Sequence, residues 1–464
     1  MKKNTINQYV IQKYLLIALL AVIISGCHKW IDTSINTNPN RPSDVTMKLL
    51  LPSTQGTLAY LVGGEYSRAA SMWMQHLSGV DRQFLSLERY ASLESEQNNP
   101  WNTLYGVVLK NIDVLQKKAE EENAMQFLGI SKVMTAYTLA IITDVWGDAP
   151  FSEALKGETG LLTPKYDSQQ EIYQAMNTLL SEAISNFGET TPMGVSLPET
   201  ADLIFKGNSA KWIAVAKSLQ VRNALHLSKR NGYGAVCDAI NAGGLIDDNS
   251  GDFQFNFGVA ANEKNPRFQF DLQRGDIRVG AKVVDLMNSA NDPRRPCYFN
   301  TKGAAGYAGS EPGGGSLSAS WIGPSYAGAG ASVFFLNYFE LKFIEAEAFF
   351  DSDKARAATA YNMGIIASLA KHGVSDGVWE AAHASETAAT ITFEKILTAK
   401  YISMFLNPES WIDWRRTGIP VLTLPASGIS ATPRRYLYPT DERVYNNSNY
   451  TSGILATGRV WWDE

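Results

Sequence analysis

The chain has 464 residues, of which 45% are hydrophobic, 19% charged and 11% aromatic. A chain of this length and composition buries a large core, which excludes a disulfide-stapled mini-protein, a collagen-like fibre and a disordered tail. Its 41 basic and 46 acidic residues leave a formal charge of −5, which argues against nucleic-acid binding because nucleic-acid-binding proteins carry a basic footprint. The 37 glycines, 19 Phe, 20 Tyr and 11 Trp indicate long loops and many flat rings.

Residues 1–26 have the pattern of a secretory signal. The start is basic and lacks acidic residues, and an unbroken apolar run covers residues 15–24. As a helix this run spans about 15 Å, which is too short for a bilayer core of about 30 Å. The segment ends in "ISGC", which resembles a bacterial lipobox, so we expect Cys27 to be acylated and to anchor the chain in a membrane. The alternative is a plain signal peptide with an incidental cysteine.

Two further cysteines, Cys237 and Cys297, lack the spacing of a zinc site. In an oxidising compartment they could form a disulfide, and two free buried thiols are an equal alternative. The sequence leaves this choice open.

Apolar residues recur at helical spacing through most of the remaining chain. Expected helices cover residues 47–77 with interruptions, 101–122, 124–144, 168–187, 209–229, 335–350, 353–371 and 387–406. The second half of 124–144 is apolar nearly all round, which predicts a central helix. Alanines at crossing-type positions let paired helices approach closely: they are Ala136, Ala140, Ala346, Ala348, Ala358 and Ala360. The predicted fold is mainly α, a tetratricopeptide-like scaffold of helix pairs with little β structure, and a general α-helical assembly is the alternative.

Two regions interrupt the helices and make the second half loop-rich. Residues 243–280 alternate short apolar runs with turns and predict one or two strands. Residues 299–334 are rich in glycine and carry Tyr307, Trp321 and Tyr326. A loop this long inside a compact domain is more often functional than idle, although a Gly-rich linker with incidental rings is the alternative.

Catalytic and metal-binding patterns are mostly missing. None of the five histidines forms a metal pair, and His226 lies in an apolar helix, as a core residue would. Ser325 lacks the final glycine of a nucleophile elbow, and residues 247–252 lack the closing glutamate of a calcium loop. Glu345 and Glu347 alternate on one helix and predict a solvated or salt-bridged face. We therefore expect a protein that is not an enzyme and needs no metal or cofactor.

A family resemblance rests on several segments in a fixed order. They are the lipobox at Cys27, "INTNPNRP", "WNTLYGVVLKNID", "ITDVWGDAPFSEAL", "PKYDSQQEIYQAM", "GNSAKWIAVAKSLQVRNALHLSK", "NDPRRPCYF", "FFLNYFELKFIEAEAFF", "ISMFLNPESWIDWRRTGIP" and "PRRYLYPTDERVYNNSNY". Together they cover nearly the whole chain after residue 26, and the chain resembles SusD/RagB-type outer-membrane lipoproteins, most closely the SusD-like branch.

The resemblance implies a single domain over residues 27–464, with a loop-rich insertion at about 243–334, on the outer face of an outer membrane. It also implies a partner, a SusC-type TonB-dependent transporter over which the protein sits as a lid. The implied cargo is a starch-like or other glycan, with a peptide as the alternative. The tryptophans and arginines of "WIDWRR" (Trp411, Trp414, Arg415 and Arg416) and the segment "DVWGDAP" are implied to brace helix ends.

The chemistry of sugars then selects candidate contacts. Sugars present apolar C–H faces and polar edges, so a glycan site needs flat rings beside charged or amide side chains. In the family such contacts come from the segment after the first helix and from loops of the second half. The expected ligand contacts are Trp321, Tyr326, Tyr307, Arg82, Phe84 and Tyr90. For each ring the alternative is packing against the scaffold. The rival functions are a lipid-anchored hydrolase built from scattered carboxylates and an assembly scaffold without a small ligand.

Overall fold

The structure is a computed structural model that describes residues 45–464 apart from 92, 193 and 427–430, together with Val10, Lys13 and Tyr14. Contacts divide the chain into two units, Met1–Thr46 and Met47–Glu464, and the helices and strands described below belong to the second unit. The expected acylation site, Cys27, lies outside the described residues.

The first half of the unit is helical almost throughout. Its helices are α2 (Met47–Leu61), the π-helical η2 (Val62–Tyr66), α3 (Ser67–Trp73), α4 (Arg82–Glu88), η3 (Glu94–Gln97), α5 (Asn98–Asn102), the π-helical η4 (Thr103–Leu109), α6 (Lys110–Glu121), α7 (Met125–Trp146), η5 (Gly157–Thr159), α8 (Gln169–Gly188), α9 (Ser209–His226), α10 (Ser228–Asn231) and α11 (Gly234–Ala242).

The second half mixes helices with loops. Its helices are η6 (Asn249–Gly251), α12 (Pro266–Gln273), α13 (Ala281–Ser289), α14 (Arg295–Tyr298), α15 (Pro324–Ala327), α16 (Tyr338–Ala348), α17 (Lys354–Lys371), α18 (Gly377–His383), α19 (Phe393–Ser403), α20 (Glu409–Thr417), α21 (Thr440–Tyr445) and η7 (Trp461–Asp463).

Strands are short and pair across long sequence distances. In the described residues they form two-stranded antiparallel sheets. The pairs are β1 (Leu77–Gly79) with β5 (Ile277–Val279), β2 (Ala149–Pro150) with β3 (Tyr166–Asp167), β4 (Phe253–Phe255) with β8 (Val333–Leu336), and β6 (Phe299–Asn300) with β7 (Trp321–Ile322). The mainly α class with little β structure is confirmed.

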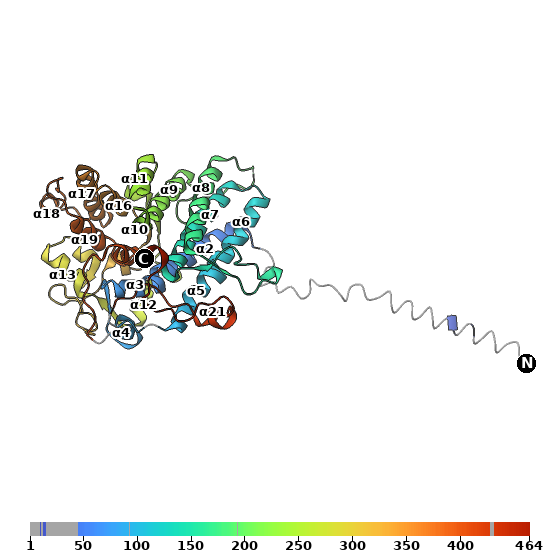
Figure 1. The fold of residues 1–464 in the computed structure, drawn as a ribbon, viewed down its shortest axis with the longest axis horizontal. Coiled ribbons are helices and arrows are strands. Elements are labelled where there is room, and N and C mark those ends of the chain that lie inside the picture. The colour runs from blue at the N-terminus through green and yellow to red at the C-terminus, as the bar shows by residue number, and fades with distance from the viewer. Residues whose placement is uncertain (1–9, 11–12, 15–44, 92, 193, 427–430) are drawn as a thin grey trace, which may run out of the picture. The chain divides into compact units, whose positions relative to one another are not determined.

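Helix α7 is the central helix, as its apolar sequence predicts. It packs against α6, α8 and α9, and Figure 1 shows these helices side by side. Among the described residues it is the one helix long and apolar enough to cross a membrane, and 78% of that stretch is buried inside the fold. Ser168 begins α8 with a capping box, its side chain and that of Glu171 each accepting a backbone N–H.

A second group of helices gathers around α16 and α17 (Figure 1). Small residues bring these two helices together, since Ala346, Ala358 and Ala360 are buried and a Cβ on Gly364 would lie 3.1 Å from the Phe343 ring. Close approach of paired helices through small side chains is what the sequence predicts.

Some local expectations are wrong. Phe335 and Leu336 begin the segment expected as a helix but belong to β8, because the backbone of this strand pairs with β4. The last long helix is shorter than expected, since α19 covers only Phe393–Ser403. Cys237 and Cys297 are free, and each thiol donates to a backbone carbonyl, of Ala348 and His372 respectively.

Helix α20 joins the helix groups through buried charges. Arg416 contacts Glu347 of α16 at 2.6 Å, and Arg415 donates to the Asp144 carbonyl at the end of α7 at 2.7 Å. Trp411 is fully buried and Trp414 is half-buried. Buried charges are tolerated when they are paired, so this arrangement holds α20 in a defined place.

Candidate ligand-binding face

Strand β5 brings two distant regions of the chain together. It pairs with β1, which lies just before the segment at residues 81–90, in the register Leu77 to Val279 and Gly79 to Ile277. Its other edge meets the Gly-rich loop, where Val279 N–H donates to Ser320 at 2.9 Å. The two regions expected to contact ligand therefore share one strand, and we call the surface around it the β5 face.

Arg82 is the first residue of α4, and it lies at one end of the β5 face. Asp81 accepts the Arg82 N–H at 2.8 Å and so caps the helix. The Arg82 guanidinium lies 3.4 Å from Oδ1 of Asp276, and Arg274 lies 3.6 Å from its Oδ2. The Arg82 side chain is 60% exposed and that of Asp276 only 2% exposed. Both separations exceed a good hydrogen bond, so the exposed arginines keep N–H groups for a ligand.

Trp321 lies at the other end of the β5 face and is half-buried. The Arg278 guanidinium lies 3.6 Å from its ring centroid, and the Lys302 ammonium lies 4.8 Å from it. Arg278 is fixed because its guanidinium also donates to the carbonyls of Gly275 and Ile277 at 2.9 and 2.7 Å. Lys302 is exposed, whereas Arg278 is buried.

A cavity of about 490 Å³ lies along α12, and Phe270 in its wall packs against Phe84 of α4. Its lining combines a ring, amides and charges: Tyr60, Glu65, Arg68, Gln269, Phe270 and Gln273. The Arg68 guanidinium lies 4.3 Å from the Phe270 ring centroid and 5.2 Å from that of Phe84. Phe84 is buried and packs edge-on against Phe270, so it supports the cavity wall from beneath.

Two carboxyl groups near the face have altered proton affinities. Burial raises the pKa of Asp271 to about 6, and the charges of Lys302 and Arg278 partly oppose this. Burial likewise raises the pKa of Glu65, with Arg68 acting against it. The face thus presents cationic donors beside carboxyl acceptors, which is a set suited to hydroxyl groups.

Three of the expected ligand rings are not exposed. Tyr326 is 2% exposed, and its ring packs against Tyr298 and Phe405 at centroid distances of 5.1 and 5.0 Å. Tyr90 is also 2% exposed, with its hydroxyl 3.4 Å from that of Thr432. Together with Phe84 these rings serve the core, because partners far away in sequence cover them.

Tyr307 is half-buried but belongs to another surface. Its ring packs against Phe299 of β6 at 5.8 Å. Phe299 pairs with Ile322, while Trp321 pairs with Asn300, so Phe299 and Trp321 leave the hairpin on opposite faces. Of the expected contacts, Arg82 is exposed and Trp321 is half-buried on the β5 face.

The sequence analysis missed most of the charged residues of this face. Arg274, Asp276 and Arg278 occur in "LQRGDIRVG", a turn and a short strand with charges on alternate residues. Charges on alternate residues are typical of a half-exposed strand, but β5 is buried throughout, because β1 and the Gly-rich loop cover it, and nothing local indicates either partner.

Other candidates from the sequence have structural roles. His226 is buried among Tyr173, Asp144 and Glu409, as expected of a core residue. Residues 247–252 form a tight turn in which Asp248 caps η6 and Asp252 accepts from Asn337 at 2.9 Å. Glu345 is ion-paired with Arg356 at 2.8 Å, as expected for a salt-bridged face, whereas Glu347 is buried.

Comparisons with known proteins agree with this architecture of helix pairs carrying a loop-built face. The family model SusD-like_2, described as "Starch-binding associating with outer membrane", matches residues 39–439. The match covers most of the chain, which therefore belongs to the SusD-like family. Comparison with curated proteins found no match.

Solved structures share the fold at low sequence identity. A chitin-binding SusD homologue from Flavobacterium johnsoniae has a TM-score of 0.76 at 22% identity, covering 90% of this chain and 98% of that one. A SusD/RagB family protein from Bacteroides thetaiotaomicron has a TM-score of 0.75 at 23% identity, covering 90% and 99%. A chitin-binding protein has a TM-score of 0.75 at 24% identity, covering 90% and 100%. At these identities the likeness concerns the fold.

Proposed function

We propose that this chain is a non-enzymatic, lipid-anchored surface protein that binds a glycan on the β5 face. It passes the glycan to a SusC-type TonB-dependent transporter in the outer membrane. Residues 1–26 are its signal peptide, residues 27–464 its single domain, and Cys27 its acylation site. The family description and the pattern of the first 27 residues support the location.

The observation that carries this proposal is the grouping of Trp321, Arg82 and Asp276 around β5. A tryptophan offers a flat apolar surface to the C–H face of a sugar. Arg82 lies 3.4 Å from Asp276 and 3.8 Å from Asp81, and Arg274 lies 3.6 Å from Asp276, so a sugar hydroxyl can compete for the N–H groups of both arginines. Asp276 is buried and positions the two arginines, so the exposed N–H groups of Arg82 and Arg274 are the donors that this part of the face offers to a hydroxyl group.

The family description favours a starch-like glucan, and two structural relatives are named as chitin-binding proteins. Both polymers are neutral and present flat pyranose faces. A peptide is the alternative cargo for the same face, because it also offers hydroxyl, amide and ring groups.

The test is the binding of Trp321→Ala to polysaccharides. In native electrophoresis through gels containing starch or soluble chitin derivatives, the wild type should be retarded, and the variant should bind about tenfold more weakly, since one stacked ring contributes on the order of 1 kcal/mol or more. Trp461→Ala is the matched control: Trp461 is also half-buried beside an arginine, with Arg230 at 4.5 Å, but lies far from β5 in sequence.

Equal binding by Trp321→Ala and the wild type would remove Trp321 from the site. Retardation by no glycan, combined with saturable binding of a peptide library, would replace the glycan by a peptide. Binding of neither contradicts the proposed function, and release of soluble products from a glycan would favour the hydrolase instead.

A further inference from the structure

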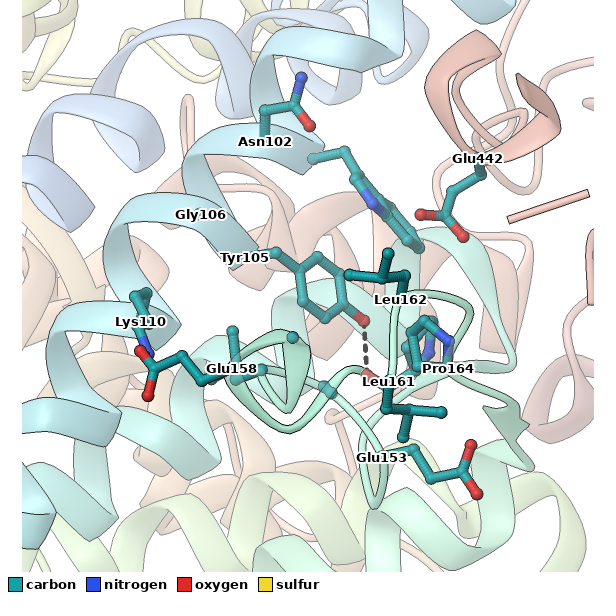
Figure 2. A pocket seen from close by; sticks show the side chains of 15 residues that line it. Asn102, Tyr105, Gly106, Lys110, Glu153, Glu158, Leu161, Leu162, Pro164 and Glu442 are labelled. Carbon is teal, nitrogen blue, oxygen red and sulfur yellow. Dashed lines mark hydrogen bonds and ion pairs between the residues drawn. The ribbon is translucent and has the colours of Figure 1, made fainter. Parts of the chain in front are cut away.

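A second cavity lies beyond η4, outside the β5 face. It has a volume of about 570 Å³ and is lined by η4, the loop at residues 150–164 and Glu442 of α21. Figure 2 shows Tyr105 in its middle, with Leu162 beside the ring. We call it the Tyr105 pocket. Volumes of 300–1,000 Å³ are usual for small-molecule sites.

Tyr105 is a fixed aromatic wall. Its hydroxyl donates to the Pro150 carbonyl at 2.8 Å, drawn as a dashed line in Figure 2. Burial of that hydroxyl, with a contribution from Glu442, raises the pKa of Tyr105 well above its usual value, so the phenol stays protonated. Trp101 backs the ring at 4.7 Å, while the ring itself is only half-buried. A ring held at its polar end and open on its face is suited to stacking.

Carboxylates surround this ring. Glu442 accepts from Tyr166 at 2.7 Å and Asn446 at 3.0 Å, and Glu153 accepts the Lys165 N–H at 2.9 Å. Neither has an ion-pair partner among the described residues, whereas Glu158 is paired with Lys110 at 2.9 Å. Figure 2 shows Glu442 and Glu153 on different sides of Tyr105 and Leu162. The pocket therefore offers negative acceptors in excess.

Apolar side chains complete the wall. Leu162 is 75% exposed, and Ala154, Leu155 and Leu161 also line the pocket. η4 is a π-helical segment, and such segments are frequent at functional sites. Thr103 of η4 lines the 490 Å³ cavity along α12, so η4 contributes residues to that cavity and to the Tyr105 pocket.

We propose that the Tyr105 pocket is a second saccharide-binding site, which stacks one pyranose ring on Tyr105 and accepts its hydroxyl hydrogens on Glu153 and Glu442. Its ligands are neutral or amino-substituted sugars. Lys110 lines the pocket but is paired with Glu158, and the carboxylates of Glu153 and Glu442 repel uronic acids and sulfated sugars. The identity of the ligand as a glycan rests on the proposed function, but the pocket is separate from Trp321 and can be tested apart from it.

Gly106 allows the pocket to be blocked without disturbing the fold. It lines the pocket, and a Cβ built on it meets nothing within 4 Å. Gly106→Trp should therefore fill the pocket from its side. Gly188→Trp is the matched control, since Gly188 ends α8, does not line the pocket and also has open space around its Cβ.

The experiment is calorimetric titration of maltoheptaose and chitohexaose into the folded full-length mature protein, with circular dichroism to verify folding. Wild type and Gly188→Trp should bind short oligosaccharide at two independent sites. Gly106→Trp should retain only the site sensitive to Trp321→Ala, and Trp321→Ala should retain only the site sensitive to Gly106→Trp. An oligogalacturonate of similar length should bind at the Tyr105 pocket at least about tenfold more weakly, because of charge repulsion.

Each other outcome decides between the two sites. A single site lost in Trp321→Ala and unchanged in Gly106→Trp overturns the Tyr105 pocket and leaves the proposed function standing. A single site lost in Gly106→Trp but not in Trp321→Ala supports the pocket and contradicts the β5 face. Oligosaccharide binding at neither site contradicts both.

Discussion

At the residue scale, buried histidines connect pH to stability. His226 is fully enclosed, and burial by itself would lower its pKa. The charges of Asp144 and Glu409, with their hydrogen bonds, outweigh burial and raise the pKa of His226 to about 9. His76 shows the opposite balance, since burial lowers its pKa to about 3 against the weaker effect of its bond to the Tyr401 carbonyl. Near neutral pH the folded protein therefore holds His226 in its charged form and His76 in its neutral form.

These two shifts act on stability from opposite sides of about pH 6.5. Because the pKa of His226 is raised on folding, its stabilisation is complete below about pH 6.5 and is lost as pH rises to about 9. The loss amounts to roughly 3 kcal/mol, given 1.36 kcal/mol per pKa unit. His76 has a lowered pKa, so its contribution is present above about pH 6.5 and is lost as pH falls towards 3.

Urea unfolding from pH 6 to 10 checks the alkaline limb. The unfolding free energy of the wild type should fall across this range, and His226→Gln should be less stable at pH 6 and show a much smaller fall. His383→Gln is the control, because His383 stacks on Trp379 near the surface and should leave the slope unchanged. A His226→Gln slope equal to that of the wild type would show that His226 is not charged in the folded state.

Some of the rings expected to contact ligand are enclosed, for a reason that also acts at the residue scale. Trp321 and Tyr326 lie five positions apart in the same Gly-rich stretch, yet one is half-buried on the β5 face and the other is enclosed. Tyr326 sits in the single turn α15, where Phe405 and His372 cover it. The glycine-rich composition of residues 299–334 predicts that both rings lie in a loop, but it does not predict which side chains pack over each ring.

At the element scale, the β5 face depends on a close approach between β1 and α4. Gly79 pairs with Ile277, and a Cβ on Gly79 would lie 1.9 Å from the Phe84 carbonyl oxygen. No side chain fits there, because backbone atoms cannot yield as a flexible side chain does. The position of Arg82 on α4 therefore depends on the absence of a side chain at residue 79.

Gly79→Ala should lower the unfolding free energy by about 1–3 kcal/mol and weaken glycan binding by moving α4 with Arg82. Gly377→Ala is the control, because a Cβ on Gly377 meets nothing within 4 Å and should leave stability equal or slightly higher. Urea titrations and glycan titrations of the two variants give both readouts. Unchanged stability in Gly79→Ala would mean that β1 and α4 are not packed this closely.

At the scale of the whole molecule, the proposed role requires an anchor that lies outside the described residues. Several acyl chains on Cys27 would hold the protein stably at a membrane, whereas a single chain binds only marginally.

Cells expressing the full chain and fed labelled palmitate check the anchor. The wild type should carry the label and sediment with membranes, and Cys27→Ser should lose both properties while still binding glycan. Cys237→Ser and Cys297→Ser are controls for other thiols and should keep the label. An unlabelled wild type, or a labelled Cys27→Ser, would contradict acylation at this position.

The sequence by itself determined the elements that depend on local patterns. The helices at 101–121, 125–146, 169–188, 209–226 and 354–371 follow from apolar spacing and caps such as Ser168 and Asp353. These are short-range effects, in which each residue interacts with neighbours three or four positions away. The ordered motifs along the chain likewise indicated the SusD-like family.

Only the tertiary structure decided which residues form a surface. The pairing of β1 with β5 joins positions two hundred residues apart, and it brings Arg82, Asp276 and Trp321 together while Tyr90 and Tyr326 are enclosed. The Tyr105 pocket is made in the same way, by η4, the loop at 150–164 and α21. Contacts of this kind depend on how the whole chain packs, because burial is a property of the partners that cover a residue and not of the residue's own neighbours in sequence.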